Sequence, residues 1–191
     1  MRTGDVHRKT NETEVLVTVS LDGKGVGRAE VKPRFFAHMI DTLSTHSLLD
    51  IMVKGEGDLQ HHLVEDVAIC LGEAILKAMG DGAAIARFGY AMVPMDCSLA
   101  IASVDFSGRP YPKIDLKLRG QCIEDMRSED ILHFFETLSI SMRSNVHLWI
   151  QYGNDDHHKA EAAVKALALA LRQALSIDPR RVGAPSSKGV L

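Results

Sequence analysis

The sequence predicts a duplicated α/β chain in which each half runs through strands, a helix, a strand, a turn and a second helix. The motif His-His-x-x-Glu occurs twice, at His61 and at His157, and each copy begins a long apolar-periodic run. A glycine and a polar residue precede both copies at the same offset. Each half also carries a phenylalanine pair further upstream, at 35–36 and at 134–135, and we match these pairs to each other. Self-similarity of this kind indicates a repeated structural unit.

Hydrophobic periodicity predicts the elements of the first half in order. Residues 13–21 alternate between apolar and polar side chains and end at an Asp-Gly pair, as expected for a strand that enters a turn. Residues 28–32 are expected to return as its partner strand. A helix is predicted over 36–45 and a strand over 48–53. The first His-His motif then begins a helix that ends near residue 79.

The second half repeats this order. Residues 88–94 and 99–106 predict two strands, and residues 129–142 predict a helix with its apolar side chains on one face. A strand is predicted over 146–152. The second His-His motif leads into the last helix, predicted over 160–175.

The composition is that of a globular chain without a dominant charge. Hydrophobic residues make up 46% and charged residues 25% of the 191 residues. The 22 basic and 25 acidic residues leave a net charge of -3, which argues against nucleic-acid binding. No stretch approaches the roughly 18 uninterrupted apolar residues of a membrane span, and the polar N-terminus predicts no secretory signal. Three cysteines without a CxxC pair favour a reducing cytoplasm over a disulfide framework.

The two His-His motifs predict metal sites. Residues four apart lie on one face of a helix, so Glu65 can share a face with His61, and Glu161 with His157. Adjacent histidines diverge by about 100° around a helix axis, so each pair is suited to two neighbouring ions rather than one. Imidazole and carboxylate ligands suit Mn, Fe, Co, Ni or Zn.

A resemblance to a known family extends this prediction. It rests on eleven segments in order: RKTNETEV at Arg8, LDGKG at Leu21, FFAHM at Phe35, GDLQHHLVED at Gly57, RFG at Arg87, PMD at Pro94, DFSGRPY at Asp105, FF at Phe134, VHL at Val146, HHKAEAAVKALALAL at His157, and DPRR with PSSKGVL from Asp178. With these segments the chain resembles the imidazoleglycerol-phosphate dehydratase family over nearly its whole length.

The resemblance implies a fold and an assembly. The fold is α+β, of the ribosomal protein S5 domain 2-like type, with two similar halves from an internal duplication and in each half a mainly antiparallel sheet covered by helices. It implies a single domain over 1–191, made of repeats over about 1–85 and 86–178 and a C-terminal phosphate-binding tail at 179–191. It also implies a homo-oligomer, with twenty-four subunits built from trimers.

The resemblance further implies two manganese ions (Mn²⁺) per active site, held at subunit contacts. The residues that match the family's ligands are His38, His61, His62, Glu65, His147, His157, His158 and Glu161. The residues that match its phosphate site are Arg87, Arg109, Lys165, Ser186 and Lys188. Glu12 matches a substrate-contacting carboxylate placed for proton transfer, and Asp96 matches another acidic residue of the same site. Glu65 and Glu161 are counted with these two as catalytic.

The activity that the resemblance implies is the dehydration of imidazole glycerol phosphate to imidazole acetol phosphate in histidine biosynthesis. In the implied mechanism the metals bind the substrate's ring as an imidazolate, which expels the C3 hydroxyl. Glu12 removes the C2 proton as general base. The partners implied are this small-molecule substrate and other copies of the chain, with no nucleic acid and no membrane.

The chain departs from the family pattern at several positions near these residues. They are Ala37, Thr42, Gln60, Cys97 and Asp155. Ala37, Gln60 and Cys97 each lack a carboxylate that could orient a histidine ring. The expectation is a divergent member with altered metal affinity.

Two other functions stay open at this point. Paired metals beside a basic phosphate site would also suit a dinuclear phosphate-ester hydrolase. Alternatively, the metals could serve only to hold subunits together in an inactive paralogue. We expect His7, His46 and His133 to be ordinary residues.

Overall fold

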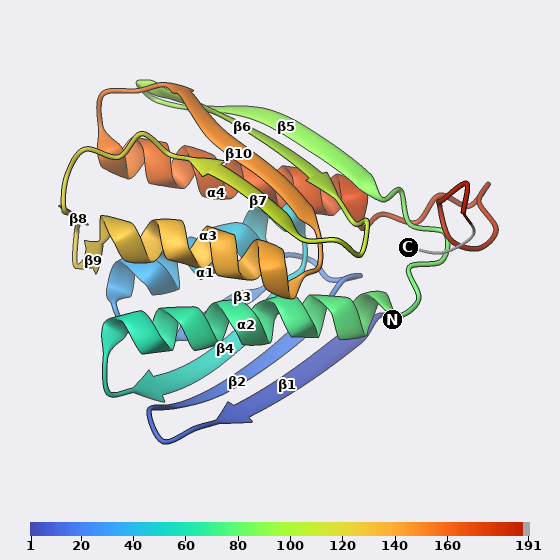
Figure 1. The fold of residues 1–191 in the computed structure, drawn as a ribbon, viewed down its shortest axis with the longest axis horizontal. Coiled ribbons are helices and arrows are strands. Elements are labelled where there is room, and N and C mark those ends of the chain that lie inside the picture. Colours follow the sequence, from blue (N-terminus) through green and yellow to red (C-terminus); the bar gives the residue numbers. More distant parts are fainter. Residues whose placement is uncertain (189–191) are drawn as a thin grey trace.

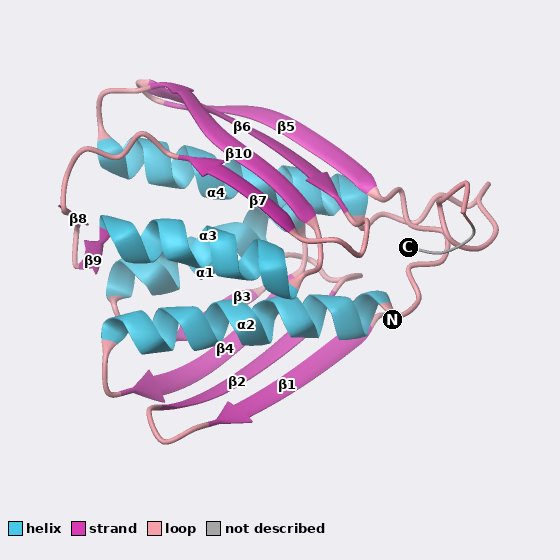
Figure 2. Ribbon diagram, in the orientation of Figure 1, coloured by secondary structure: helices cyan, strands magenta, loops and turns pink. Residues whose placement is uncertain are grey.

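Two four-stranded sheets enclose the long helices in the computed structural model, which describes residues 1–188 (Figures 1 and 2). The elements of the first half are β1 (Thr3–Lys9), β2 (Thr13–Ser20), β3 (Gly27–Glu30), α1 (Arg34–Ser47), β4 (Asp50–Gly57) and α2 (Gln60–Met79). Those of the second half are β5 (Phe88–Met95), β6 (Ser98–Asp105), β7 (Tyr111–Asp115), β8 (Cys122–Ile123), β9 (Met126–Arg127), α3 (Ser128–Ser141), β10 (Asn145–Tyr152) and α4 (Asp156–Ala174).

The two sheets share one topology. The strand order is β1-β2-β4-β3 in the first sheet and β5-β6-β10-β7 in the second. In each sheet the last pair, β3 with β4 or β7 with β10, is parallel, and the other pairs are antiparallel. This confirms the predicted α+β fold of two similar halves.

The alternation in the sequence places one face of each sheet on the helices. Val15, Val17 and Val19 of β2 are fully buried, whereas Leu16 between them is 46% exposed. Apolar side chains of the helices fill the space between the sheets.

Within residues 1–188, no helix is both long and apolar enough to span a bilayer.

The prediction that residues 28–32 pair with the strand at 13–21 was wrong. Residues 27–30 do form a strand, but β3 pairs in parallel with β4 and not with β2. Both edges of β2 are already taken, because β1 lies on one side and β4 on the other. β1 was missed because it is an edge strand whose buried face carries only Gly4 and Val6.

The short helix of each half packs on the His-His helix of the other half. α1 contacts α4, and α3 contacts α2. Phe36 and Phe134 meet edge to face across this junction, with ring centroids 5.2 Å apart. The two halves therefore share a single core, and side chains from opposite halves are brought together at the helix ends.

Glycines allow the close approach of the His-His helices to the first strand of each sheet. A Cβ on Gly89 would overlap the carbonyl oxygen of Ala170 in α4, and one on Gly4 would overlap that of Ala74 in α2. We expect Gly89→Ala to destabilise the protein by about 1–3 kcal/mol, the usual effect of overpacking. Urea unfolding measures this. Gly120→Ala is the control, because its Cβ would lie 3.3 Å from the Cys122 carbonyl oxygen, a tight contact but not an overlap. Equal stability of the two variants would contradict the account.

Candidate active site

One cluster of possible metal ligands lies where α3 crosses the start of α2. Single ligand atoms from His61, Glu65 and His133 all lie within 4.8 Å of one another. The rings of His61 and His133 stack with centroids 4.6 Å apart. Together with His62, these residues form what we call the first half-site.

A matching cluster lies where α1 crosses the start of α4. His38 Nε2 is 2.6 Å from Glu161 Oε1, and His157 Nε2 is 3.6 Å from the same oxygen. Together with His158, these residues form the second half-site. In each half-site, the His-His-x-x-Glu helix of one half lies next to a histidine that belongs to the short helix of the other half.

Glu161 is held ionised although it is nearly buried. Burial raises the pKa of its carboxyl, but hydrogen bonds from His38 and Lys165 outweigh this and leave the pKa below its usual value. Lys165 Nζ lies 3.2 Å from Glu161 Oε2. A carboxylate that stays charged among imidazoles can serve as a metal ligand.

All four histidines of the two His-His motifs have a partner at Nδ1. The partner atom is Asp130 Oδ1 at 2.8 Å for His61, Asp58 Oδ1 at 2.9 Å for His62, Glu124 Oε1 at 3.2 Å for His157, and Cys97 Sγ at 3.5 Å for His158. A partner at Nδ1 fixes the ring and leaves Nε2 for a metal ion, an arrangement common in metal sites. The donor set therefore fits divalent metals.

These partners also shift the ionisation of the rings. The hydrogen bond to Asp58 raises the pKa of His62. The Cys97 thiol raises the pKa of His158, and the His158 ring lowers the pKa of Cys97 to about 6. Cys97 thus supplies a partner for His158 at a position where the sequence pattern lacks a carboxylate.

Two exposed acids lie next to His62 and His158, the second histidine of each His-His motif. Glu12, in the turn between β1 and β2, has Oε2 3.6 Å from His62 Nδ1. Asp96, in the turn between β5 and β6, has Oδ2 3.3 Å from His158 Nε2. Both carboxylates are more than half exposed and can reach a bound molecule.

His133 takes the place that the sequence prediction gave to His147. His147 is exposed on β10, between the buried Val146 and Leu148, so it points from the sheet face opposite the helices. Its ring lies 6.0 Å from that of Tyr111. The structure therefore does not bring His147 to either half-site of the chain, whereas His133, which we expected to be an ordinary residue, lies in the first half-site.

The repeat itself holds the signal that would have found His133. β4 and β10 correspond at an offset of 95 residues, since they span Asp50–Gly57 and Asn145–Tyr152. The same offset takes His38 to His133. Matching the phenylalanine pairs shifted α1 against α3 by one helical turn and hid this correspondence.

The residues predicted to hold a phosphate, apart from Lys165, lie together at the other end of the molecule. Arg87, Arg109, Ser186 and Lys188 line a cavity of 270 Å³. Arg87 is held by both oxygens of Asp105, at 2.6 and 3.2 Å. Guanidinium, ammonium and hydroxyl groups around one cavity suit a phosphate dianion.

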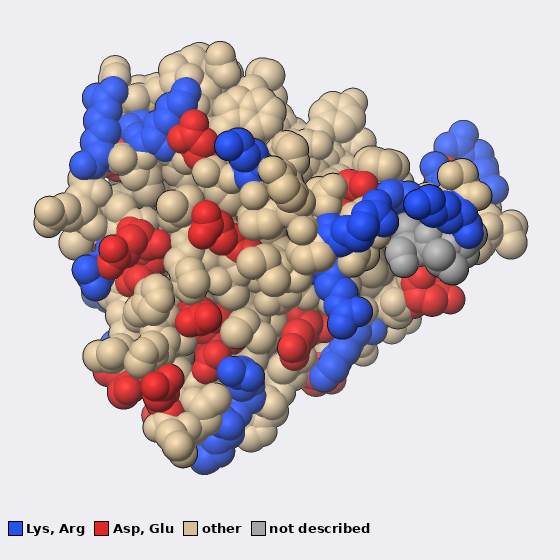
Figure 3. Space-filling view, viewed as in Figure 1, with Lys and Arg blue, Asp and Glu red and all other residues tan. Residues whose placement is uncertain are grey.

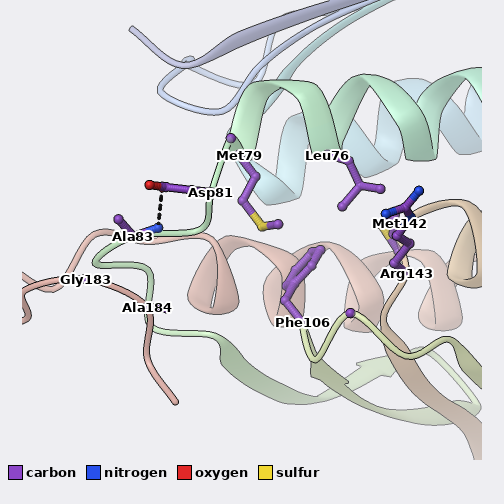
Figure 4. Close-up of a pocket in the computed structure, with 11 residues that line it drawn as sticks. Leu76, Met79, Asp81, Ala83, Phe106, Met142, Arg143, Gly183 and Ala184 are labelled. Atoms are coloured by element: carbon purple, nitrogen blue, oxygen red, sulfur yellow. Dashed lines mark hydrogen bonds between the residues drawn. The ribbon is translucent and has the colours of Figure 1, made fainter. Parts of the chain in front are cut away.

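The C-terminal tail is anchored beside this cavity. Ala84 donates its backbone N–H to Gly183, and Arg87 Nη1 donates to the carbonyl of Pro185. Gly183 and Ala184 also line a larger cavity of 620 Å³ at the end of α2 (Figure 4). Lys and Arg side chains gather around the tail in the space-filling view (Figure 3). Residues 189–191 of the predicted tail lie outside the described residues.

Lys165 does not join the other phosphate-site residues within one chain. It lies in α4, where its Nζ contacts Glu161 and Met95 Sδ. The structure therefore places it at the second half-site.

The cavity and the half-sites of one chain are far apart. His61 lies in the first turn of α2, and α2 runs 20 residues toward the tail. At 1.5 Å per residue this is about 30 Å. Figure 1 shows the starts of α2 and α4 at one end of the molecule and the tail at the other. A small substrate cannot touch both regions of the same chain.

Asp130 is a further candidate site residue that the sequence did not predict. It is fully buried and holds both His61 Nδ1 and the amide of Gln60. It lies in the first turn of α3, at a position with no counterpart in the motif, so only the packing of the halves shows its role. It supplies the carboxylate that Gln60 lacks.

We expect Asp130→Asn to weaken metal binding at the first half-site by on the order of 10–100-fold, because it removes the charge that orients His61. Calorimetric titration with Mn²⁺ measures the change. Asp115→Asn, an exposed change on β7, is the control. Unchanged affinity in the Asp130 variant would contradict the assigned role.

Comparison with known proteins decides the family. The model of the family "Imidazoleglycerol-phosphate dehydratase" matches residues 31–171. A relative of that name from Dehalococcoides mccartyi is 47% identical over 191 residues, which cover 100% of this chain and 97% of the relative. The chain belongs to the imidazoleglycerol-phosphate dehydratase family.

Other members support this assignment. The imidazoleglycerol-phosphate dehydratase of Methanothermobacter thermautotrophicus is 44% identical, covering 100% of this chain and 98% of its own. The crystal structure of the Staphylococcus aureus dehydratase matches with a TM-score of 0.85 at 29% identity, over 92% of this chain and 99% of the other. The Pyrococcus furiosus dehydratase matches with a TM-score of 0.84 at 32% identity, over 97% and 100%.

Membership confirms the predicted enzyme class. Imidazoleglycerol-phosphate dehydratases are hydro-lyases, which remove water from their substrate, and the chain is an enzyme of this class with a role in histidine biosynthesis.

Proposed function

We propose that this dehydratase converts imidazole glycerol phosphate to imidazole acetol phosphate with two divalent metal ions, Mn²⁺ in the cell. The observation that carries the proposal is the pair of half-sites: in each, histidines lie around a glutamate, and both histidines of the His-His motif have a partner at Nδ1. The residues that would hold the ions are His61, His62, Glu65 and His133 in one half-site and His38, His157, His158 and Glu161 in the other. Bound ions would act as Lewis acids and as a template for the substrate's ring.

Glu12 is the general base in this proposal. Its carboxylate is exposed in a turn that faces the first half-site, next to His62. It takes the proton from C2 as the C3 hydroxyl leaves, and the enol that results becomes the ketone. Asp96 occupies the corresponding place beside His158, where it can hold or return a proton.

The basic cavity holds the substrate phosphate. Arg109, Ser186 and Lys188 face it, while Asp105 and the tail fix the orientation of Arg87. Fixing the phosphate positions C2 and C3 for reaction, which contributes to rate through orientation.

The active site is completed between chains. Since the cavity and the half-sites of one chain are about 30 Å apart, a bound substrate must take its phosphate contacts from another subunit. Lys165, at the second half-site, can meet the phosphate from that side. We therefore propose a homo-oligomer. The family resemblance implies that it has twenty-four subunits built from trimers. The three free cysteines agree with a cytoplasmic location.

Product analysis tests the proposal against the alternatives. Purified protein with Mn²⁺ is incubated with imidazole glycerol phosphate, and both imidazole acetol phosphate and inorganic phosphate are quantified. We expect the ketone without phosphate release. Phosphate release would show a hydrolase, and no reaction by metal-loaded oligomer would show an inactive paralogue.

A further inference from the structure

The short β8–β9 hairpin holds one residue in a strained backbone conformation. Ile123 pairs with Met126, so Glu124 and Asp125 form a two-residue turn. Glu124 has a φ of 52°, in the left-handed region that glycine occupies without a steric penalty. Strain of this kind persists where the surrounding structure demands it, and it is common at functional sites.

The side chain of Glu124 ends at the second half-site. Its Oε1 lies 3.2 Å from His157 Nδ1, while Nε2 of the same ring lies 3.6 Å from Glu161. A carboxylate at Nδ1 favours the tautomer whose Nε2 lone pair is open to a metal ion. The strained residue is thus the one that sets the orientation of His157.

The hairpin is fixed to both helices that supply the second half-site. Asp125 accepts the backbone N–H groups of Arg34 and Phe35, at 2.8 and 2.9 Å, at the start of α1. On the other side, Asp156 in the first turn of α4 accepts the N–H of Gly120, two residues before β8, at 2.7 Å. Glu124 therefore extends from a support tied to the helix of His38 and to the helix of His157.

In the first half-site, the corresponding histidine has its Nδ1 partner on a different kind of element. His61, the counterpart of His157, has Asp130 at its Nδ1, and Asp130 lies in α3 rather than in a hairpin. The repeat thus duplicates the ligands but not the groups that orient them. Asp130 and Glu124, the acids at His61 and His157, both belong to the half that carries α3.

We infer that Glu124 is a positioning residue of the second half-site, which holds the His157 ring in the orientation that metal binding requires. This rests on the proposed metal-dependent function. A positioning role has a consequence that a structural role lacks: replacing Glu124 with glycine relieves the strain and yet weakens metal binding.

The test uses Glu124→Gly, Glu124→Gln and, as a control for strain relief, Lys117→Gly. Lys117 lies in the loop between β7 and β8 and has a φ of 50°. Its ammonium group donates a hydrogen bond to the carbonyl of the exposed Gln151. Full-length protein is stripped of metal, its thermal midpoint is measured, and Mn²⁺ is titrated by calorimetry. A ¹⁵N spectrum of the metal-free histidines reports the tautomer of His157.

For Glu124→Gly we expect an equal or higher thermal midpoint and a Kd for Mn²⁺ at the second half-site raised on the order of 10–100-fold. Glu124→Gln keeps an oxygen acceptor and loses less affinity. Lys117→Gly keeps wild-type affinity.

Wild-type affinity in Glu124→Gly would overturn the inference and leave the proposed function standing. A lower midpoint together with lower affinity would show a structural role and would also overturn it. Failure of the wild-type protein to bind Mn²⁺ would overturn the proposed function itself. In that case an unchanged His157 tautomer in Glu124→Gly would separately reject the orienting role.

Discussion

Glu12→Gln is expected to lower turnover of imidazole glycerol phosphate by about 10²–10⁴-fold, the usual contribution of a general base. The amide cannot take the C2 proton, but it occupies the same volume in the exposed β1–β2 turn. Glu12 is not among the residues that would hold metal, so metal content stays at the wild-type level. Turnover and bound Mn²⁺ are measured on the same preparation.

Glu14→Gln is the matched control for this variant. Glu14 lies two residues further along the same chain, and its carboxylate bonds to His7 and Lys9 rather than to a half-site residue. It should keep wild-type turnover. A Glu12→Gln enzyme with normal activity would remove Glu12 from the mechanism.

Mixed oligomers are expected to recover activity that neither parent variant has. Arg109→Ala weakens the phosphate site at one end of the chain, and Glu12→Gln disables the other end. On the proposal, each active site takes these two residues from different subunits. Co-expressed, randomly mixed particles should therefore regain roughly a quarter of wild-type activity, because that share of sites receives both intact residues.

The control for mixing is a particle in which two differently tagged chains both carry Arg109→Ala, and it should stay inactive. Activity is measured on oligomers purified through both tags. If mixed particles are no more active than the parents, the phosphate site and the metal site belong to the same chain, and the proposed arrangement of the active site is wrong.

The sequence predicts most of the fold because its repeat and its periodicities are strong. The alternating Val15, Val17 and Val19 and the apolar faces of the long helices fix the central strands and the His-His helices. Edge strands were harder to predict. β1 buries little beyond Val6, and the parallel pairing of β3 with β4 depends on which edges the other strands leave open. Pairing of this kind is a property of the whole sheet and not of the segment.

The site could be predicted where the motif carries it and not where packing carries it. His61, His157, Glu65 and Glu161 follow from helical spacing alone. His133 required the correct offset between the halves. Asp130 and the contact of His38 with Glu161 depend on the crossing of helices that belong to different halves. Glu124 reaches His157 from the β8–β9 hairpin. No local sequence pattern contains these contacts.

The central claim is that paired half-sites hold divalent metal for the dehydration. The most direct test is to measure metal content and turnover together, on oligomer purified with chelator and then titrated with Mn²⁺. The account predicts that the stripped enzyme forms no imidazole acetol phosphate and that activity rises in step with bound metal until two ions per active site are present. Full turnover by metal-free protein would contradict it.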